Sequence, residues 1–238
     1  MTMLKTREDI VDWLDKYSVK KYTVNEDLSV EVEGNVSLSS VGLVGNLPVR
    51  FGRVVGNFDC DNNQLTSLLG CPAMVLESFN CSNNNLTSLL DCPWSIRNNF
   101  NCSNNELTSL LGCPIEIMGD FNCSYNKLSN LVGCPIYVFD DFNCSNNKLL
   151  NLIDSPEYVG GNYNCKINKL TSLYGCSFEV RGNLYCSENE SLDTIFYDMR
   201  FKDIRNYLDN MSFEEIRNCV DNKESNEGVG KVVMGKKI

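Results

Sequence analysis

The stretch that decides the fold reads FNCSNNNLTSLLDCPWSIRNN over residues 79–99, FNCSNNELTSLLGCPIEIMGD over residues 100–120 and FNCSYNKLSNLVGCPIYVFDD over residues 121–141. The three units align without a gap, and the same 21-residue period extends from about residue 54 to residue 189. Self-similarity at a fixed period of this length is typical of a solenoid, in which each repeat stacks on its neighbours. The sequence therefore predicts a single repeat domain.

The units share the pattern F-x-C-x-x-N-x-L, in which the first two fixed residues alternate as the core-facing residues of a strand do. The three fixed columns are Phe58, Phe79, Phe100, Phe121, Phe142, Tyr163 and Leu184, then Cys60, Cys81, Cys102, Cys123, Cys144, Cys165 and Cys186, then Asn63, Asn84, Asn105, Asn126, Asn147, Asn168 and Asn189. The pattern matches the leucine-rich-repeat signature L-x-L-x-x-N-x-L. We expect the Asn amides to bond backbone groups of neighbouring turns as a ladder, so all three columns are predicted to be structural.

The predicted fold class is an α/β-type repeat solenoid, predominantly β with loops: a leucine-rich-repeat horseshoe of about seven regular 21-residue repeats with a parallel sheet. Residues 1–51 are predicted to form an N-terminal cap of helix, hairpin and degenerate repeat, and residues 52–192 the array. The helix is expected to begin at Thr6, with Ile10, Trp13, Leu14 and Tyr17 on its apolar face. Residues 193–221 are predicted to form a C-terminal helical cap and residues 222–238 a flexible tail.

The units also resemble those of small repeat proteins encoded by large tailed bacteriophages and some bacteria, which look like C-S-x-N-x-L-T-S-L-x-G-C-P-x-x-V. The segments YTVNEDLSV from Tyr22 and LPVRFGRV from Leu47 are similar to the entry sequence of that family, so the resemblance covers roughly residues 6–190. It implies an accessory protein made in the host cytoplasm during infection, which interferes with a host protein or an antiviral defence system. It supplies no catalytic residues.

Composition argues against several other functions. The chain contains no His, which removes the commonest general base and the most frequent zinc ligand, and its Cys residues lack C-x-x-C spacing. We therefore expect no enzyme, no cofactor and no metal. The formal charge is −10, which disfavours duplex nucleic acid as a direct partner, and no apolar stretch is long enough to span a membrane. The polar N-terminus and odd number of Cys favour a cytoplasmic protein with reduced thiols.

The leading functional hypothesis is a protein-binding scaffold whose partner is a host protein. Positions that are usually charged in the resembling family are apolar here, and they predict partner contacts on outer columns of the solenoid. The candidate residues are Leu69, Met74, Leu90, Trp94, Leu111, Ile115, Ile136, Tyr137, Phe139, Tyr158, Tyr174 and Phe178. Two alternatives stay open: the column that begins at Leu69 turns inward and thickens the core, or the apolar stripe joins two copies into a homo-oligomer.

A second hypothesis places binding on the concave face, where a polar array would hold a small polar ligand or act as an acidic mimic of nucleic acid. A salt-sensitive complex that depends on the acidic side chains would favour it. The secondary candidates are Asp59, Asp61, Asp120, Tyr125, Asp141, Ile167 and Tyr185.

Overall fold

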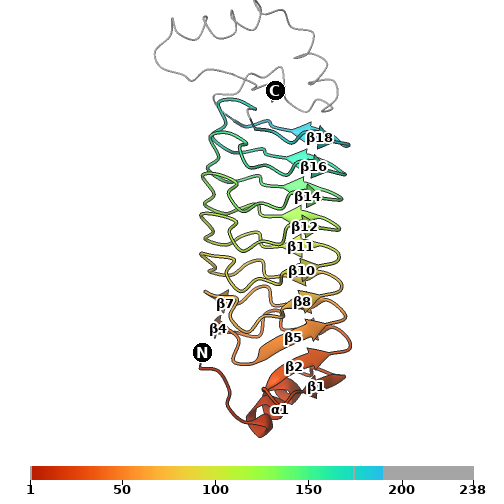
Figure 1. Cartoon of the computed structure of the whole chain (residues 1–238). Coiled ribbons are helices and arrows are strands. Elements are labelled where there is room, and N and C mark those ends of the chain that lie inside the picture. Colours follow the sequence, from red (N-terminus) through yellow and green to blue (C-terminus); the bar gives the residue numbers. More distant parts are fainter. Residues whose placement is uncertain (1, 174, 190–238) are drawn as a thin grey trace, which may run out of the picture.

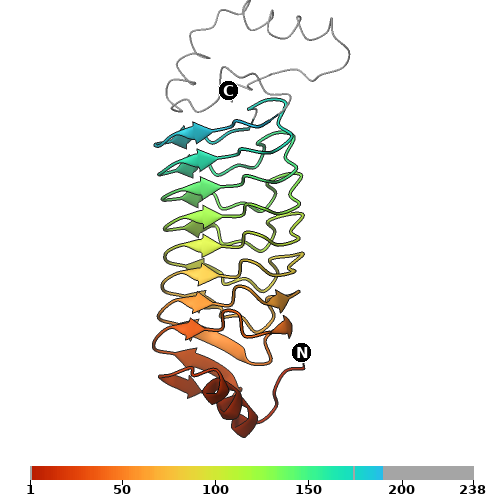
Figure 2. The ribbon, with the colours of Figure 1, turned by 180° about the vertical axis from the view of Figure 1, so that it is seen from behind.

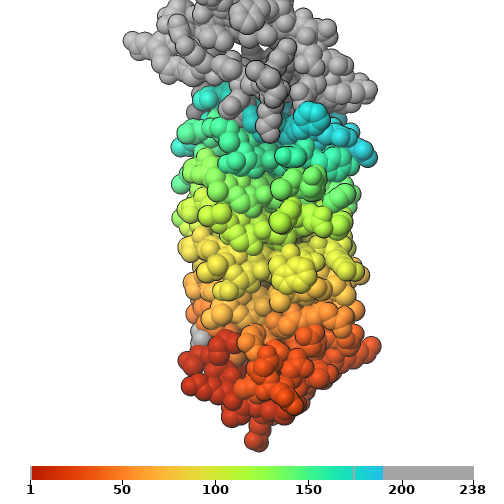
Figure 3. All heavy atoms as spheres, in the orientation of Figure 1, coloured from red at the N-terminus to blue at the C-terminus, as the bar shows by residue number. Residues whose placement is uncertain are grey.

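The computed structural model describes residues 2–173 and 175–189, which stack as coils in a column (Figure 1). The column is a predominantly β parallel solenoid of about seven regular turns, with little helix. The coils rise along a nearly straight line in both ribbon views, and the space-filling view shows a column of even width (Figures 2 and 3). The horseshoe curvature expected from the sequence is not visible in these views. The predicted C-terminal helices and tail lie outside the described residues, as does Tyr174.

The helix and hairpin expected near the N-terminus are both present. Helix α1 (Arg7–Lys16) begins at Thr6, whose hydroxyl accepts a hydrogen bond of 3.1 Å from the N–H of Asp9. Ile10 and Leu14 are buried, and the Trp13 ring lies 6.4 Å from that of Phe51 in the first coils. Strands β1 (Tyr22–Val24) and β2 (Ser29–Val32) pair antiparallel, and β2 then pairs parallel with β5 (Arg50–Val54). The hairpin is therefore continuous with one sheet of the column.

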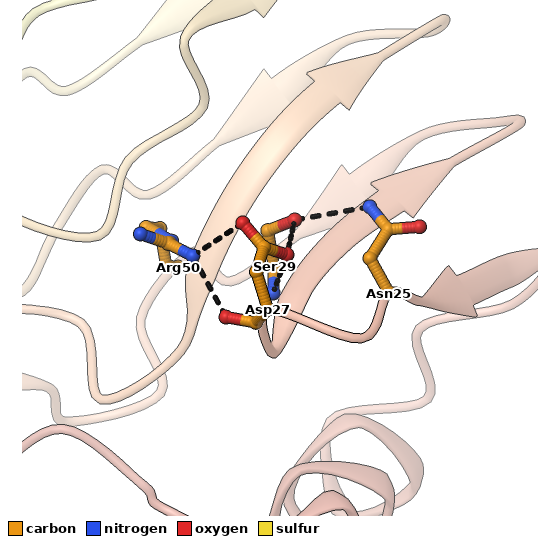
Figure 4. Close-up of polar contacts among 4 residues, drawn as sticks. All are labelled: Asn25, Asp27, Ser29 and Arg50. Carbon is orange, nitrogen blue, oxygen red and sulfur yellow. Dashed lines mark hydrogen bonds and ion pairs between the residues drawn. The ribbon is translucent and has the colours of Figure 1, made fainter.

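A polar network joins the hairpin turn to β5 (Figure 4). The Arg50 guanidinium donates to the Asp27 carboxylate at 2.7 Å and to the Asp27 carbonyl at 2.8 Å. The Ser29 hydroxyl donates to Asp27 at 2.6 Å and accepts from the Asn25 amide at 3.0 Å. The hydrogen bonds from Ser29, followed by the charge of Arg50, lower the pKa of the Asp27 carboxyl.

Each regular coil has three segments joined by three turns. The first segment, which we call the Phe side, forms an eight-stranded parallel sheet. Its strands are β3 (Val36–Ser37), β6 (Phe58–Asp59), β9 (Phe79–Asn80), β11 (Phe100–Asn101), β13 (Phe121–Asn122), β15 (Phe142–Asn143), β17 (Tyr163–Asn164) and β19 (Leu184–Tyr185). The second segment, the Leu side, includes a short sheet of β4 (Val44–Gly45) and β7 (Gln64–Leu65).

The third segment, the Val side, forms two sheets that divide between β10 and β12. The first contains β1, β2, β5, β8 (Met74–Val75) and β10 (Ser95–Ile96), and the second contains β12 (Glu116–Ile117), β14 (Tyr137–Val138), β16 (Tyr158–Val159) and β18 (Glu179–Val180). We call the turn after the Phe side the first corner, the turn before the Val side the second corner, and the turn before the next Phe side the third corner.

Residues 36–47, predicted as part of the N-terminal cap, form a coil of the column. Strand β3 pairs in parallel register with β6, and Leu38, Leu43 and Leu47 are fully buried. The sequence of this coil departs from the F-x-C pattern. Its buried residues nevertheless have the spacing needed to fill the same core positions as in the regular coils. The Phe-side sheet therefore has one more strand than the seven regular units predict.

Two stacks of identical residues stabilise the column. The Phe79, Phe100, Phe121 and Phe142 rings are stacked at centroid distances of 5.5, 5.4 and 5.6 Å, which combines core burial with aromatic contact. The Asn ladder is present as predicted. The Asn84 amide donates to the carbonyl of Cys60 in the previous coil at 3.0 Å and to that of Cys81 at 3.2 Å, and its oxygen accepts from the N–H of Leu65 at 2.9 Å. Each buried Asn thus satisfies backbone groups of two coils.

Candidate partner-binding surface

The second corner directs one apolar side chain per coil toward solvent. In each turn the N–H of the Cys, or of Ser155 in one coil, bonds to the carbonyl three residues earlier, as with Cys92 and Leu89 at 3.0 Å. Leu89 is buried, so the next residue, Leu90, points outward and is 70% exposed. Leu69, Leu111, Val132 and Ile153 are exposed in the same way. The alternative that this column turns inward is therefore wrong for these coils, because the turn reverses the chain immediately after the buried Leu.

The Val side carries a second group of exposed apolar residues. Trp94 is 66% exposed and Ile115 69% exposed. The N–H of Ile136 bonds to the carbonyl of Ile115 at 2.7 Å, so these two residues occupy the same position in neighbouring coils. Tyr137, Phe139 and Phe178 are also exposed, whereas Met74 and Tyr158 are half-buried.

The half-buried Tyr158 belongs to a small aromatic cluster. Its ring lies 5.8 Å from that of Phe139, one coil earlier, and the Arg181 guanidinium lies 5.2 Å from its centroid, one coil later. The Tyr158 ring therefore packs between side chains of the two neighbouring coils, in contacts that favour aromatic rings.

Exposed apolar residues are unevenly distributed among the sides. Of the sixteen large apolar side chains that are exposed in the described part of the chain, twelve lie on the second corner and the Val side. We call these twelve the apolar outer surface: Leu69, Leu90, Trp94, Leu111, Ile115, Met118, Val132, Ile136, Tyr137, Phe139, Ile153 and Phe178. Four of the twelve are aromatic, namely Trp94, Tyr137, Phe139 and Phe178, and an aromatic side chain of this kind carries about 150–250 Å² of surface.

The outward residues of the Phe side are engaged with their own backbone. The side-chain oxygens of Asn80, Asn101, Asn122 and Asn143 each accept the N–H two residues later at 3.1–3.2 Å. One acceptor site of each amide oxygen is therefore used within the protein. At the other end of this side Tyr185 is half-buried beneath the Lys166 ammonium, which lies 5.2 Å from the ring centroid.

The four secondary acidic candidates do not share one surface. Asp59 and Asp61 are half-buried on the Phe side, where burial and then the neighbouring Asp61 raise the pKa of the Asp59 carboxyl. Asp120 and Asp141 instead lie at the third corner, where the Asp120 carboxylate accepts the N–H of Asp141 at 2.9 Å and Asp141 accepts that of Asn162. The sequence placed them beside the strand, but the stacked turns use them to bond the next coil.

Tyr125 and Ile167 also lie off the strand surface, at the first corner, and are exposed. Sequence reasoning missed residues beside them: Lys127, Lys148 and Lys169, which replace the Gln64, Asn85 and Glu106 of earlier coils, and Leu150, which replaces a Thr or Ser. The signal for these residues is a change of residue type at an outward position of an otherwise constant repeat.

The thiols are packed rather than activated. Cys81, Cys123 and Cys165 are fully buried, and burial raises the pKa of each thiol. Within residues 2–173 and 175–189, no three His, Cys, Asp or Glu side chains are grouped as metal ligands would be. No helix in that same part of the chain is long and apolar enough to cross a bilayer.

Comparison of the chain with protein-family models, curated proteins and solved structures gives no match.

Proposed function

We propose that the chain is a non-enzymatic scaffold of the leucine-rich-repeat type that binds and blocks a protein partner through its apolar outer surface. The observation that carries the proposal is the concentration of exposed apolar side chains on one corner and one side of the coil. Apolar groups of this number and size are costly to leave in water, and large exposed patches generally mark interfaces. The polar Phe side offers a weaker anchor, because its Asn oxygens already accept backbone N–H groups.

The proposed class of partner rests on the resemblance of the repeat units to phage-encoded proteins. That resemblance favours a host protein in the bacterial cytoplasm, such as a component of antiviral defence, as the target. The stacked rings and Asn ladder tie the backbone of each coil to its neighbours, so we expect the backbone of the scaffold to lose little conformational entropy on binding. Trp94, Tyr137 and Phe139 are the proposed anchors, together with the half-buried Tyr158 beside this surface, since aromatic residues dominate binding hot spots.

The test compares three tagged proteins in bacterial lysate: wild type, a W94E/I115E/F139E variant of the apolar outer surface, and a T66E/T87E/T108E control. The three Thr residues of the control are exposed on the Leu side, so both variants gain the same negative charge. Circular dichroism first establishes that both variants fold. We expect wild type and control to capture a stoichiometric protein that the W94E/I115E/F139E variant loses, as shown by mass spectrometry.

Gel filtration of the purified proteins separates heterologous binding from self-association. A monomeric wild type that captures a partner supports the proposal. A wild type that is dimeric, and becomes monomeric only in the W94E/I115E/F139E variant, would instead assign the surface to a homo-oligomer. Retention of the same partner by all three proteins would refute the assignment of the surface.

A further inference from the structure

A group of lysines lies at the start of the Leu side, next to the first corner, in three successive coils. All four lysines between residues 22 and 189 fall within residues 127–169. Lys127, Lys148 and Lys169 occupy one position in three successive coils, since each backbone N–H bonds to the carbonyl of a Leu one coil earlier at 2.8–2.9 Å. All three side chains are exposed. A chain with a net charge of −10 thus carries a local row of three ammonium groups, of which Lys127 also pairs with Glu106 one coil earlier.

The same three coils carry unusual apolar residues beside that row. Tyr125 is 60% exposed and Ile167 41% exposed at the first corner, and Leu150 is 53% exposed on the Leu side next to Lys148. The equivalent first-corner position is Asn in four of the seven regular coils, and the Leu150 position is otherwise Thr or Ser. Each of the three is therefore a departure from the repeat toward a larger apolar group that remains in water.

Two of these departures strain the backbone. The first-corner residue has a positive φ in every regular coil, with φ of 53° at Tyr125 and 52° at Ile167. Asn tolerates this left-handed conformation, whereas a β-branched residue such as Ile rarely adopts it. Neighbouring coils enforce it, because Ile167 donates to the Ser187 carbonyl at 3.2 Å and accepts from the Asn147 N–H at 3.3 Å. Because Tyr125 and Ile167 are both exposed, burial of their side chains does not offset the cost of the strained backbone. The strain therefore indicates a role outside folding.

We propose that Lys127, Lys148 and Lys169, with Tyr125, Leu150 and Ile167, form a second binding surface, the lysine ridge, for an extended acidic segment of a protein that also carries apolar side chains. The lysines supply charge complementarity to carboxylates, and the three apolar groups supply desolvated contact.

The dimensions of the ridge fit a short peptide. Coils stack about 4.8 Å apart, so Tyr125 and Ile167, two coils apart, are separated by about 10 Å, close to three residues of an extended chain. The ridge ends where Glu106 pairs with Lys127 on one side and where Glu188 occupies the first corner on the other. A longer polyanion such as nucleic acid would extend past both ends of the ridge, where the surrounding surface of this acidic protein would repel it. Nucleic acid is therefore a disfavoured ligand of the ridge.

The ridge is independent of the apolar outer surface, which lies on the second corner and the Val side. The proposal does not require the proposed function to hold. The two surfaces share no residue, so the failure of either proposal can be recognised separately.

The test pans a random peptide library displayed on phage against the full chain, then measures binding of the most enriched peptide by fluorescence anisotropy. We compare wild type with K127Q/K148Q/K169Q, with Y125N/I167N and with a D91G/D154G control. Asp91 and Asp154 have φ of 65° and 66° at the second corner, where other coils have Gly, so the control also relieves backbone strain. Single-stranded DNA of matched charge serves as a second probe.

We expect enrichment of peptides with Asp or Glu and Leu, Ile or Phe, whose affinity falls as salt rises. Binding should weaken about tenfold or more in K127Q/K148Q/K169Q and in Y125N/I167N, and stay unchanged in D91G/D154G. Y125N/I167N should also melt at a higher temperature than wild type. The proposal is overturned if enriched peptides lack acidic residues, if Y125N/I167N binds as well as wild type or is no more stable, or if the DNA binds more tightly than the peptide.

Discussion

The polar pair between Ser155 and Tyr163 predicts a strong energetic coupling between two residues that both depart from the repeat. Tyr163 takes the place of Phe in the stacked column, and Ser155 takes the place of Cys. Tyr163 is fully buried, and its hydroxyl lies 2.7 Å from the Ser155 hydroxyl and 4.0 Å from the Cys144 sulfur. The two departures thus satisfy each other, which a double-mutant cycle can measure.

The magnitudes follow from what each change leaves without a partner. S155C leaves a buried phenol with only weak sulfur acceptors and should lower the free energy of unfolding by about 1–3 kcal/mol. Y163F removes the hydrogen bond between the two hydroxyls but leaves only the half-buried Ser155 hydroxyl without it. This should lower the free energy of unfolding by about 0.5–1.5 kcal/mol. The S155C/Y163F double variant restores the Cys and Phe found at these positions in the preceding coil. Its free energy of unfolding should lie close to that of wild type. Urea denaturation should therefore give a coupling energy of about 1 kcal/mol or more.

The preceding coil offers a matched transplant. Cys134 and Phe142 stand eight residues apart, as Ser155 and Tyr163 do. F142Y alone should destabilise the protein because its hydroxyl enters a core of thiols, and adding C134S should recover most of that loss. Additive effects in both cycles would refute the reasoning, since they would mean that the hydroxyls do not interact in the folded state.

Three further predictions concern charge, capping and the thiols. D59N should raise the melting temperature at pH 7, because the raised pKa of Asp59 means that its ionised carboxylate destabilises the folded state. The gain should vanish below the ordinary Asp pKa of 3.8, and a gain at pH 3 would contradict this explanation. T6A should cost about 1 kcal/mol of unfolding free energy by removing the cap of α1, and a change below the error of a urea titration would exclude that role. Burial raises the thiol pKa of Cys81, Cys123 and Cys165 above the usual 9.0, so stability should fall as pH rises through 9. These thiols should also react slowly with Ellman's reagent in the native protein; rapid labelling would show that they are accessible.

Much of the fold could be predicted from the sequence because the repeat fixes inward positions by simple physical rules. The 21-residue spacing of Phe, Cys and Asn predicts stacked parallel strands, and the structure confirms the Asn ladder down to its backbone partners. Thr6 followed by Asp9 predicts the start of α1. The coil over residues 36–47 is predicted only as a degenerate repeat, because its buried residues keep the size pattern of the core but do not match the residues of the motif.

The candidate surface was harder to predict, because an outward residue is placed by turn geometry that the repeat pattern does not encode. The direction of the Leu69 column depended on whether the second corner closes directly after Leu68, which only the backbone shows. The position of Asp120 and Asp141 next to a strand predicts that they share a face with Asp59, yet they bond the next coil at the third corner. Whether any of these surfaces binds a partner stays a prediction.

The repeat itself supplies a way to separate structural from functional residues in a single sequence. Inward positions such as Phe100 and Asn105 stay constant because each coil must satisfy the same neighbours above and below. An outward position is under no such constraint, so a change there from Asn to Ile, at a φ that Ile rarely adopts, needs another cause. Differences between coils therefore indicate which outward residues serve a role other than folding. Ile167 and Tyr125 are the strongest such indications in the column, because at this positive φ they destabilise the fold more than Asn would.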